Sequence, residues 1–421
     1  MGTDNKPKRY YHIIGLVMLI FFVISFITNI LNSIIVDVKN SFDLSLSLTG
    51  LLPFAFFIAY GVMSIPAGFL SEKYSDRRLL SLSFLFMALA SLVFTLFPGY
   101  VIFSITLFVL GSCMAVLQVI INPMLRAAGG EEHFAFNSVL AQLVFGLASF
   151  LSPFLYKYVV DEDSTDGGLA KLLRDVVSED LPWVGLYLVF SGIAVLLLIV
   201  VFLVRYPKYQ KKADEVAGDS QSYINLLKNK WTLLFFLGIF CYVGTEQGVG
   251  NWISQFLFEY HGLDAQTVGA DTVAYFWAML TIGCLLGLLL LKIMDSRKLL
   301  IGATLITMVF IVLALLGNTR TALFAFPAIG FFISVMWSII FSLALNSVKE
   351  NHGSLSGILC TGIAGGAIFP LIVGGLGQLT NLRFGMFFLL IPLGFILSIG
   401  FWARPLVNNK TVSFKKENVD A

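Results

Sequence analysis

Residues 12–36 read HIIGLVMLIFFVISFITNILNSIIV, a stretch that is almost wholly apolar and contains no Asp, Glu, Lys or Arg. The hydrocarbon core of a bilayer is about 30 Å thick, and roughly 20 apolar residues in a helix are enough to cross it. No small-residue cleavage site follows the stretch, which distinguishes it from a signal peptide. Residues 12–36 are therefore predicted to form a membrane-spanning helix.

Eleven further stretches of the same kind follow, so the sequence predicts an all-α membrane protein with twelve transmembrane helices. Turn signals separate them, and the weakest are Phe97-Pro98-Gly99 and Gly317-Asn318. The eleven stretches are 47–70, 79–97, 100–121, 136–156, 183–204, 232–257, 272–293, 299–316, 321–346, 355–379 and 384–403.

The composition of the whole chain agrees with this prediction and excludes several classes of protein. Of 421 residues, 58% are apolar and 12% are charged, whereas a soluble domain has about 45–50% and 25%. The formal net charge of +2 gives no sign of a nucleic-acid partner. HExxH, GxSxG and phosphate-loop motifs are absent, so neither an enzyme nor a cofactor is expected. A non-transporting membrane sensor is a weaker alternative, because no loop is large enough for an output domain.

The Lys and Arg residues predict the orientation. With the N-terminus inside, 21 of the 27 lie on the inner side, which is the bias of cytoplasmic loops. Both termini are thus predicted to be cytoplasmic, and the compact loops suit a bacterial inner membrane. The polar, basic segment 206–230 divides the chain into an N-terminal six-helix bundle, 1–205, and a C-terminal one, 231–421. We expect a monomer surrounded by membrane lipid.

Glu246 is the one residue among 25 Asp and Glu that falls inside a predicted span. A charge within the membrane is costly, and by default it marks a functional site. No Lys or Arg lies deep in any predicted span, so Glu246 either keeps a proton or binds a cation from solution. Both possibilities suit a cation-coupled transporter. A protonated structural glutamate, hydrogen-bonded to a neighbouring helix, remains an alternative.

Neutral polar residues in several spans indicate a wet cavity. Those of the first span share one helix face, which must meet a cavity or another helix; they are Ser25, Thr28, Asn29, Asn32 and Ser33. Their amides and hydroxyls suit the hydroxyls of a sugar, and Trp337 is favoured over Trp252 and Trp277 to face its ring. Hydrogen bonding between helices is the open alternative. The substrate-binding candidates are Asn29, Asn32, Ser33, Gln118, Asn122, Gln142, Gln247, Asn251 and Trp337.

The sequence GFLSEKYSDRR at residues 68–78 resembles the GxxxD(R/K)xGRR motif of the major facilitator superfamily. It departs from the motif in having Glu72 for Asp and Ser75 for Gly. The resemblance implies two six-helix bundles related by a pseudo-two-fold axis, with a substrate site between them at mid-membrane. It also implies that this loop latches helix ends through charge pairs without touching substrate. The gating residues implied are Gly68, Glu72, Lys73, Asp76, Arg77 and Arg78.

Three further stretches resemble the fucose:proton symporter family of sugar transporters. LQVIINP at 117–123 is similar to that family's LETAANP, and LAQ at 140–142 is similar to its LAQ. The stretch from IFSLALNS at 340–347 to Pro370 resembles its IFSLGIKNLG…GSS…IIGGGIVTP run. The resemblance covers both halves of the chain and implies a sugar as substrate.

The departures from that family concern its coupling acids. The family has an Asp in span one and a Glu in span four, where this chain has Ser33 and Gln118. We hypothesise that Glu246 has taken the coupling role, with Na⁺ or H⁺ as the driving ion. Thr245, Gln247 and Asn251 would supply oxygen ligands near Glu246, which slightly favours Na⁺, whereas H⁺ needs only the carboxylate.

The function predicted is therefore cation-coupled uptake of a hexose-type monosaccharide by alternating access. Two alternatives within transport stay open, a proton-coupled multidrug antiporter and an uncoupled sugar uniporter.

Overall fold

The computed structural model describes residues 10–44, 46–160, 173, 176–178, 181–206, 220–264, 268–349 and 351–411. Inside these ranges, the side chains of 31–33, 35–36, 46–47, 49–50, 153, 157 and 220–223 are not described. The described chain is almost entirely helical, and 12 helical segments are long and apolar enough to cross a membrane. This confirms the predicted fold class.

The first bundle contains the helices that precede residue 206. Proline residues inside α2 and α4 do not end these helices, which is common where neighbouring helices and polar side chains satisfy the freed backbone groups. The helices are α1 (Tyr11–Ser41), α2 (Leu46–Lys73), α3 (Asp76–Leu96), α4 (Tyr100–Gly129), η1 (Glu131–His133), α5 (Phe134–Val160), η3 (Pro182–Val184) and α7 (Gly185–Leu203).

The second bundle follows a short helix, α8 (Ser220–Lys228), within the predicted linker. Residues 207–219 of that linker lie outside the described residues, and the domain boundaries at 205 and 231 stay predictions. The helices of the second bundle are α9 (Lys230–Gly250), α10 (Ile253–His261), α11 (Ala270–Ile293), α12 (Ser296–Leu316), α13 (Thr319–Ile333), α14 (Met336–Leu345), α15 (His352–Thr361), η6 (Gly362–Ala364), α16 (Gly365–Leu379), α17 (Leu382–Phe387) and α18 (Leu390–Trp402).

Several spans of the second bundle are interrupted. The predicted span 232–257 is not one helix, because α9 ends at Gly250 and α10 begins at Ile253. Gly244, Gly248 and Gly250 weaken the end of α9, since glycine is the poorest helix former after proline. The indole Nε1 of Trp252, at the break, donates to the Pro370 carbonyl at 3.1 Å. The break thus falls at the end of the candidate membrane span Lys230–Gly250, where Asn251 is exposed.

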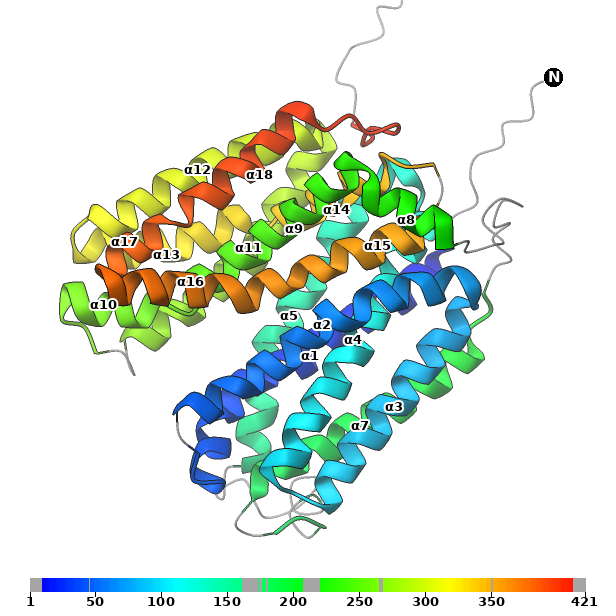
Figure 1. Cartoon of the computed structure of the whole chain (residues 1–421), viewed down its shortest axis with the longest axis horizontal. Coiled ribbons are helices and arrows are strands. Elements are labelled where there is room, and N and C mark those ends of the chain that lie inside the picture. Colours follow the sequence, from blue (N-terminus) through cyan, green and yellow to red (C-terminus); the bar gives the residue numbers. More distant parts are fainter. Residues whose placement is uncertain are drawn as a thin grey trace, which may run out of the picture.

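The two bundles converge at one end of the molecule and spread apart toward the other (Figure 1). They meet around α8, α14 and α15, whereas α10 and α17 lie at the far end of the second bundle. The converging end includes Tyr10, the ends of α4 and α14, and residues 403–411. We call this end the terminal face, and the other end the opposite face.

Polar contacts between the bundles cluster at the terminal face. The Arg126 Nε donates to Asn346 Oδ1 at 2.8 Å, and the backbone N–H of Ser354 donates to Glu72 Oε1 at 3.0 Å. Lys410 reaches Glu132 twice, through its backbone N–H at 3.0 Å and through Nζ at 3.4 Å. The terminal face is therefore fastened by hydrogen bonds and ion pairs.

Glycine allows the bundles to approach closely where α2 crosses α15. A Cβ atom on Gly357 would lie 2.5 Å from the Ser64 carbonyl oxygen, and one on Gly68 would lie 3.1 Å from the Gly357 Cα. Any larger side chain at Gly357 would force the two backbones apart. Small residues serve the same purpose in membrane helix packing generally.

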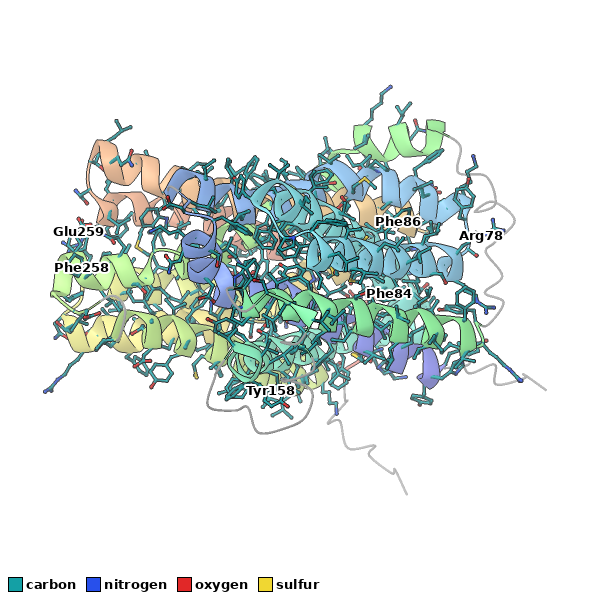
Figure 2. The ribbon with its side chains drawn as sticks, turned by 90° about the horizontal axis from the view of Figure 1, so that it is seen from below. Arg78, Phe84, Phe86, Tyr158, Phe258 and Glu259 are labelled. Carbon is teal, nitrogen blue, oxygen red and sulfur yellow. The ribbon has the colours of Figure 1, made fainter. Side chains whose placement is uncertain are left out.

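The outer surface of the bundles is apolar between charged ends. Figure 2 shows Arg78 at the opposite end of the molecule from Phe258 and Glu259. On α3, Phe84 is fully buried whereas the Phe86 side chain is 55% exposed. An apolar side chain exposed in this way on a spanning helix suits contact with lipid tails.

Candidate functional site

A cavity lies between the two bundles and is lined by α1, α2, α4 and α5 on one side and by α9, α11, α14 and η6 on the other. Its volume is about 140 Å³. A water-sized group needs about 10–15 Å³, so the cavity accommodates on the order of ten such groups. That is the size of a monosaccharide and is larger than a single ion.

The first-bundle wall of the cavity carries amides and hydroxyls. The predicted residues Asn29, Gln118 and Gln142 all line it, together with Thr28 and Ser149. Gln118 and Gln142 are only 8% and 9% exposed. Within the described part of the chain the Gln118 Oε1 has no hydrogen-bond partner. This wall therefore offers neutral acceptors and donors to a bound molecule.

Part of the polar face of α1 also holds the bundle together. The Asn29 Nδ2 donates to Ser149 Oγ on α5 at 2.8 Å, and Ser25 Oγ lies 2.8 Å from the same oxygen. Ser25 is fully buried. The alternative of interhelical hydrogen bonding thus holds for Ser25, while Asn29 serves both the α1–α5 contact and the cavity.

The second-bundle wall carries an acid and aromatic rings. Glu246 lines the cavity four residues before the end of α9, and the Tyr242 hydroxyl, one helical turn earlier, donates to its Oε1 at 2.8 Å. The Tyr242 ring lies 6.1 Å from that of Trp337. Gln247, Trp277, Thr281 and Trp337 also line this wall.

Among the described residues, no cationic side chain forms an ion pair with Glu246. The ion pairs between described residues are Arg126–Glu131, Arg297–Asp295 and Lys410–Glu132, and none of them includes Glu246. The Tyr242 hydroxyl and the Gln247 side chain, which hydrogen-bond to Glu246, are neutral and do not balance its charge. Glu246 is therefore placed to exchange a proton, or to bind a cation, from the cavity.

The ring of oxygen ligands predicted for Na⁺ does not assemble around Glu246 in the described chain. The Thr245 hydroxyl donates to the Cys241 carbonyl at 2.7 Å and is buried away from the cavity. Asn251 is exposed just beyond the last residue of α9. Of the three predicted ligands, only Gln247 shares the cavity with Glu246.

Other predicted substrate residues are also placed elsewhere. Asn122 is fully buried on the terminal-face side of the cavity and does not line it. Asn251 does not line the cavity either. Asn32 and Ser33 lie in α1, but their side chains are outside the described residues. Their assignment to substrate stays a prediction.

Sequence reasoning missed some residues that line the cavity. Tyr242 and Thr281 were not proposed, and Trp277 was ranked below Trp337 although both line the cavity. Tyr242 precedes Glu246 by four residues, so a search for donors one turn from the buried acid would have found it. Thr281 carries no such signal, because its position follows from the contact of α11 with Gly146 of α5.

A second acid lies on a helix that lines the cavity. Asp37, one residue beyond the predicted span 12–36, lies in α1 eight residues after Asn29. It accepts a hydrogen bond from the Tyr156 hydroxyl at 2.6 Å. Because a helix rises about 1.5 Å per residue, Asp37 is about 12 Å nearer the opposite face than Asn29.

The predicted gating loop lies at the terminal face. Besides the Glu72 contact to the start of α15, the Arg77 guanidinium donates to the Phe202 carbonyl at 2.6 Å and sits 5.2 Å from the Phe202 ring centre. Lys73 lies 5.8 Å from the Tyr74 ring centre, and Asp76 begins α3. The resemblance had implied charge pairs in this loop. Glu72 and Arg77 instead contact backbone groups and the Phe202 ring.

Comparison with known proteins agrees with this architecture. The chain is 29% identical over 401 residues to a glucose/galactose transporter of Brucella abortus, covering 94% of this chain and 95% of the relative. It is 24% identical to an L-fucose-proton symporter of Escherichia coli, covering 88% and 89%.

Solved structures show the same fold. The E. coli fucose:proton symporter superposes with a TM-score of 0.79 at 20% identity, over 93% of this chain and 98% of that one. A proton:xylose symporter bound to 6-bromo-6-deoxy-D-glucose gives 0.74 at 12% identity, over 94% and 96%. The family model of the Major Facilitator Superfamily matches residues 17–370. With two six-helix bundles around a central cavity, and with this match over most of its length, the chain belongs to the Major Facilitator Superfamily of transporters.

Proposed function

We propose that the protein is a proton-coupled symporter that takes up a neutral hexose. The observation that carries this proposal is the pairing of one unbalanced carboxylate, Glu246, with a cavity whose other polar groups are uncharged. Coupling requires a group that can gain and lose the driving cation within reach of the substrate. Glu246 meets that requirement in the described chain.

The choice of a hexose rests on the lining of the cavity. Sugars present hydroxyls around an apolar ring face, and Gln118 and Gln142 can exchange hydrogen bonds with the hydroxyls while Trp337 or Trp277 covers the face. An anionic substrate would need a cation here, which the lining lacks. The named relatives, a glucose/galactose transporter and an L-fucose-proton symporter, support the same substrate class.

The proton is the driving ion that the geometry favours over Na⁺. A proton needs only the carboxylate, whereas Na⁺ needs several oxygen ligands, and Thr245 and Asn251 do not reach Glu246. The Tyr242 hydroxyl can donate to the ionised carboxylate and can remain nearby when the acid is protonated. The similar fucose:proton and proton:xylose symporters are consistent with this choice.

We place the terminal face in the cytoplasm, because the inner loops and tails assigned from the sequence hold 21 of the 27 Lys and Arg residues. In this state the cavity would receive substrate from the external side, because the terminal face is closed. Rocking of the two bundles would release substrate inward, and substrate and proton drive it only through different affinities for the two states. The helices of one chain surround the cavity, so a monomer is sufficient for transport. We assign the protein to a bacterial inner membrane.

Uptake into proteoliposomes with imposed ion gradients tests this function. We expect a hexose from a panel of labelled glucose, galactose, fucose and N-acetylated hexoses to accumulate when the interior is alkaline, with or without Na⁺. Accumulation that needs a Na⁺ gradient and ignores pH would refute the choice of ion. Equilibration without accumulation under every gradient would instead identify an uncoupled uniporter.

A further inference from the structure

Three polar residues follow one face of α4 from the cavity to the terminal face. Gln118, Asn122 and Arg126 are spaced by four residues, so they lie above one another on the helix. Gln118 lines the cavity, and Arg126 donates to Asn346 of the second bundle at 2.8 Å. Each step of four residues is about 6 Å long. Asn122 therefore lies midway between the cavity and the closed contact, on a face turned toward the second bundle.

The side chain of Asn122 is incompletely satisfied in this state. It is fully buried, and its Nδ2 donates to the Gln118 carbonyl at 2.8 Å. Its Oδ1 has no hydrogen-bond partner within the described part of the chain. A buried unpaired acceptor costs free energy, and such a group in a folded protein needs an explanation. A role in another conformation would supply one.

The second bundle has a similar series of residues that leads from the cavity to the terminal face. We call this series and the series on α4 the two columns. Trp337 lines the cavity, and Phe341, one turn further along α14, packs against it with ring centres 5.4 Å apart. Asn346, just beyond α14, accepts from Arg126 and donates to the Glu131 carbonyl at 3.3 Å. Separation of Arg126 from Asn346 would open the space between these columns and expose Asn122 to it.

We propose that Asn122 binds the substrate in the state that opens to the terminal face. Its Oδ1 accepts a hydrogen bond from a hydroxyl of the sugar as the sugar leaves the central cavity, which makes Asn122 part of an inner subsite absent from the present state. This inference rests on the proposed sugar transport. It assigns Gln118 to the central cavity and Asn122 to the exit.

The test measures the KM for sugar separately from each face, using right-side-out and inside-out membrane vesicles. For Asn122→Leu we expect KM to rise about tenfold from the terminal face and to stay within twofold of wild type from the opposite face. Gln118→Leu is the matched control on the same helix face, and it should raise KM from the opposite face. Unchanged KM from the opposite face also shows that Asn122→Leu is folded.

Two results would overturn the inference. One is a wild-type KM from the terminal face in Asn122→Leu, and the other is an equal rise from both faces. If Asn122→Leu does not insert in the membrane, Asn122→Ala carries the same expectation. Absence of hexose transport by the wild-type protein would be a different result, because it would refute the proposed function itself.

Discussion

The two walls of the cavity both combine polar groups with aromatic rings, but they differ in charge. The first-bundle wall has neutral amides such as Gln118 and Gln142, whereas the second-bundle wall has the carboxylate of Glu246 beside Tyr242 and two indoles. The amides of the first-bundle wall can recognise a hydroxylated substrate, but these side chains do not gain or lose a proton in the physiological pH range. The second-bundle wall contains the one ionisable acid of the lining. The difference suggests a division of labour, with substrate recognition on one bundle and ion coupling on the other.

The largest effect should come from removing the acid. In Glu246→Gln we expect the ratio of internal to external sugar to fall from well above 1 to about 1, because an amide cannot carry the driving proton. Sugar-for-sugar exchange should continue, since the first-bundle wall is intact. Steady-state uptake and exchange of labelled hexose measure the two activities.

Asp37→Asn is the matched control for that variant. It removes an acid that also lies on a cavity-lining helix, about 12 Å nearer the opposite face than Asn29. We expect accumulation to persist there. Loss of accumulation in Asp37→Asn together with retention in Glu246→Gln would transfer the coupling role to the first bundle.

The next largest effect should come from Gln142→Leu on the opposite wall. Loss of a hydrogen bond that leaves a buried substrate hydroxyl unpaired costs about 1–3 kcal/mol, so affinity for sugar should fall about 5- to 150-fold. Accumulation at saturating sugar should remain. Equilibrium binding of labelled hexose checks the affinity, and Asn251→Leu, exposed beyond α9, should stay within about twofold of wild type.

Tyr242→Phe should have a smaller effect that falls on coupling. The ring and its contact with Trp337 remain, but the 2.8 Å hydrogen bond to Glu246 is lost. We expect the initial rate of proton-driven uptake to fall about 5-fold with little change in sugar affinity. A fall in affinity at an unchanged rate would assign Tyr242 to substrate recognition and would blur the proposed division.

The smallest effect is expected at the terminal face, away from both walls. The Lys410–Glu132 pair is 3.4 Å apart with side chains more than half exposed, and such pairs contribute about 1 kcal/mol or less. Glu132→Lys should therefore change the uptake rate by less than about 5-fold. The double variant with Lys410→Glu should return toward wild type, and rates that do not recover would show that the ion pair is not the cause.

The twelve spans followed from the sequence because lipid leaves helices few alternatives, and Glu246 stood out because charges are rare within spans. Asn251, predicted to bind substrate, is not part of the cavity lining in this structure. Asn251 keeps the helical hydrogen bond from its N–H to the Gln247 carbonyl at 3.0 Å, but it is exposed at the end of α9 and does not line the cavity. Asn122 shows a different limit, because spacing of four residues identifies a helix face but not the depth at which the cavity closes. Neither the break in α9 nor the closed state of the terminal face could be derived from one sequence.

The division between the walls can be tested most directly by counting the protons that accompany the sugar. A pH electrode follows weakly buffered proteoliposomes after hexose is added outside, while labelled sugar entry is measured in parallel. In the wild-type protein the outside medium should become more alkaline in fixed proportion to the sugar that enters. Glu246→Gln should admit sugar in exchange assays with no accompanying alkalinisation. A Glu246→Gln protein that still moves protons with sugar in the wild-type proportion would contradict the account.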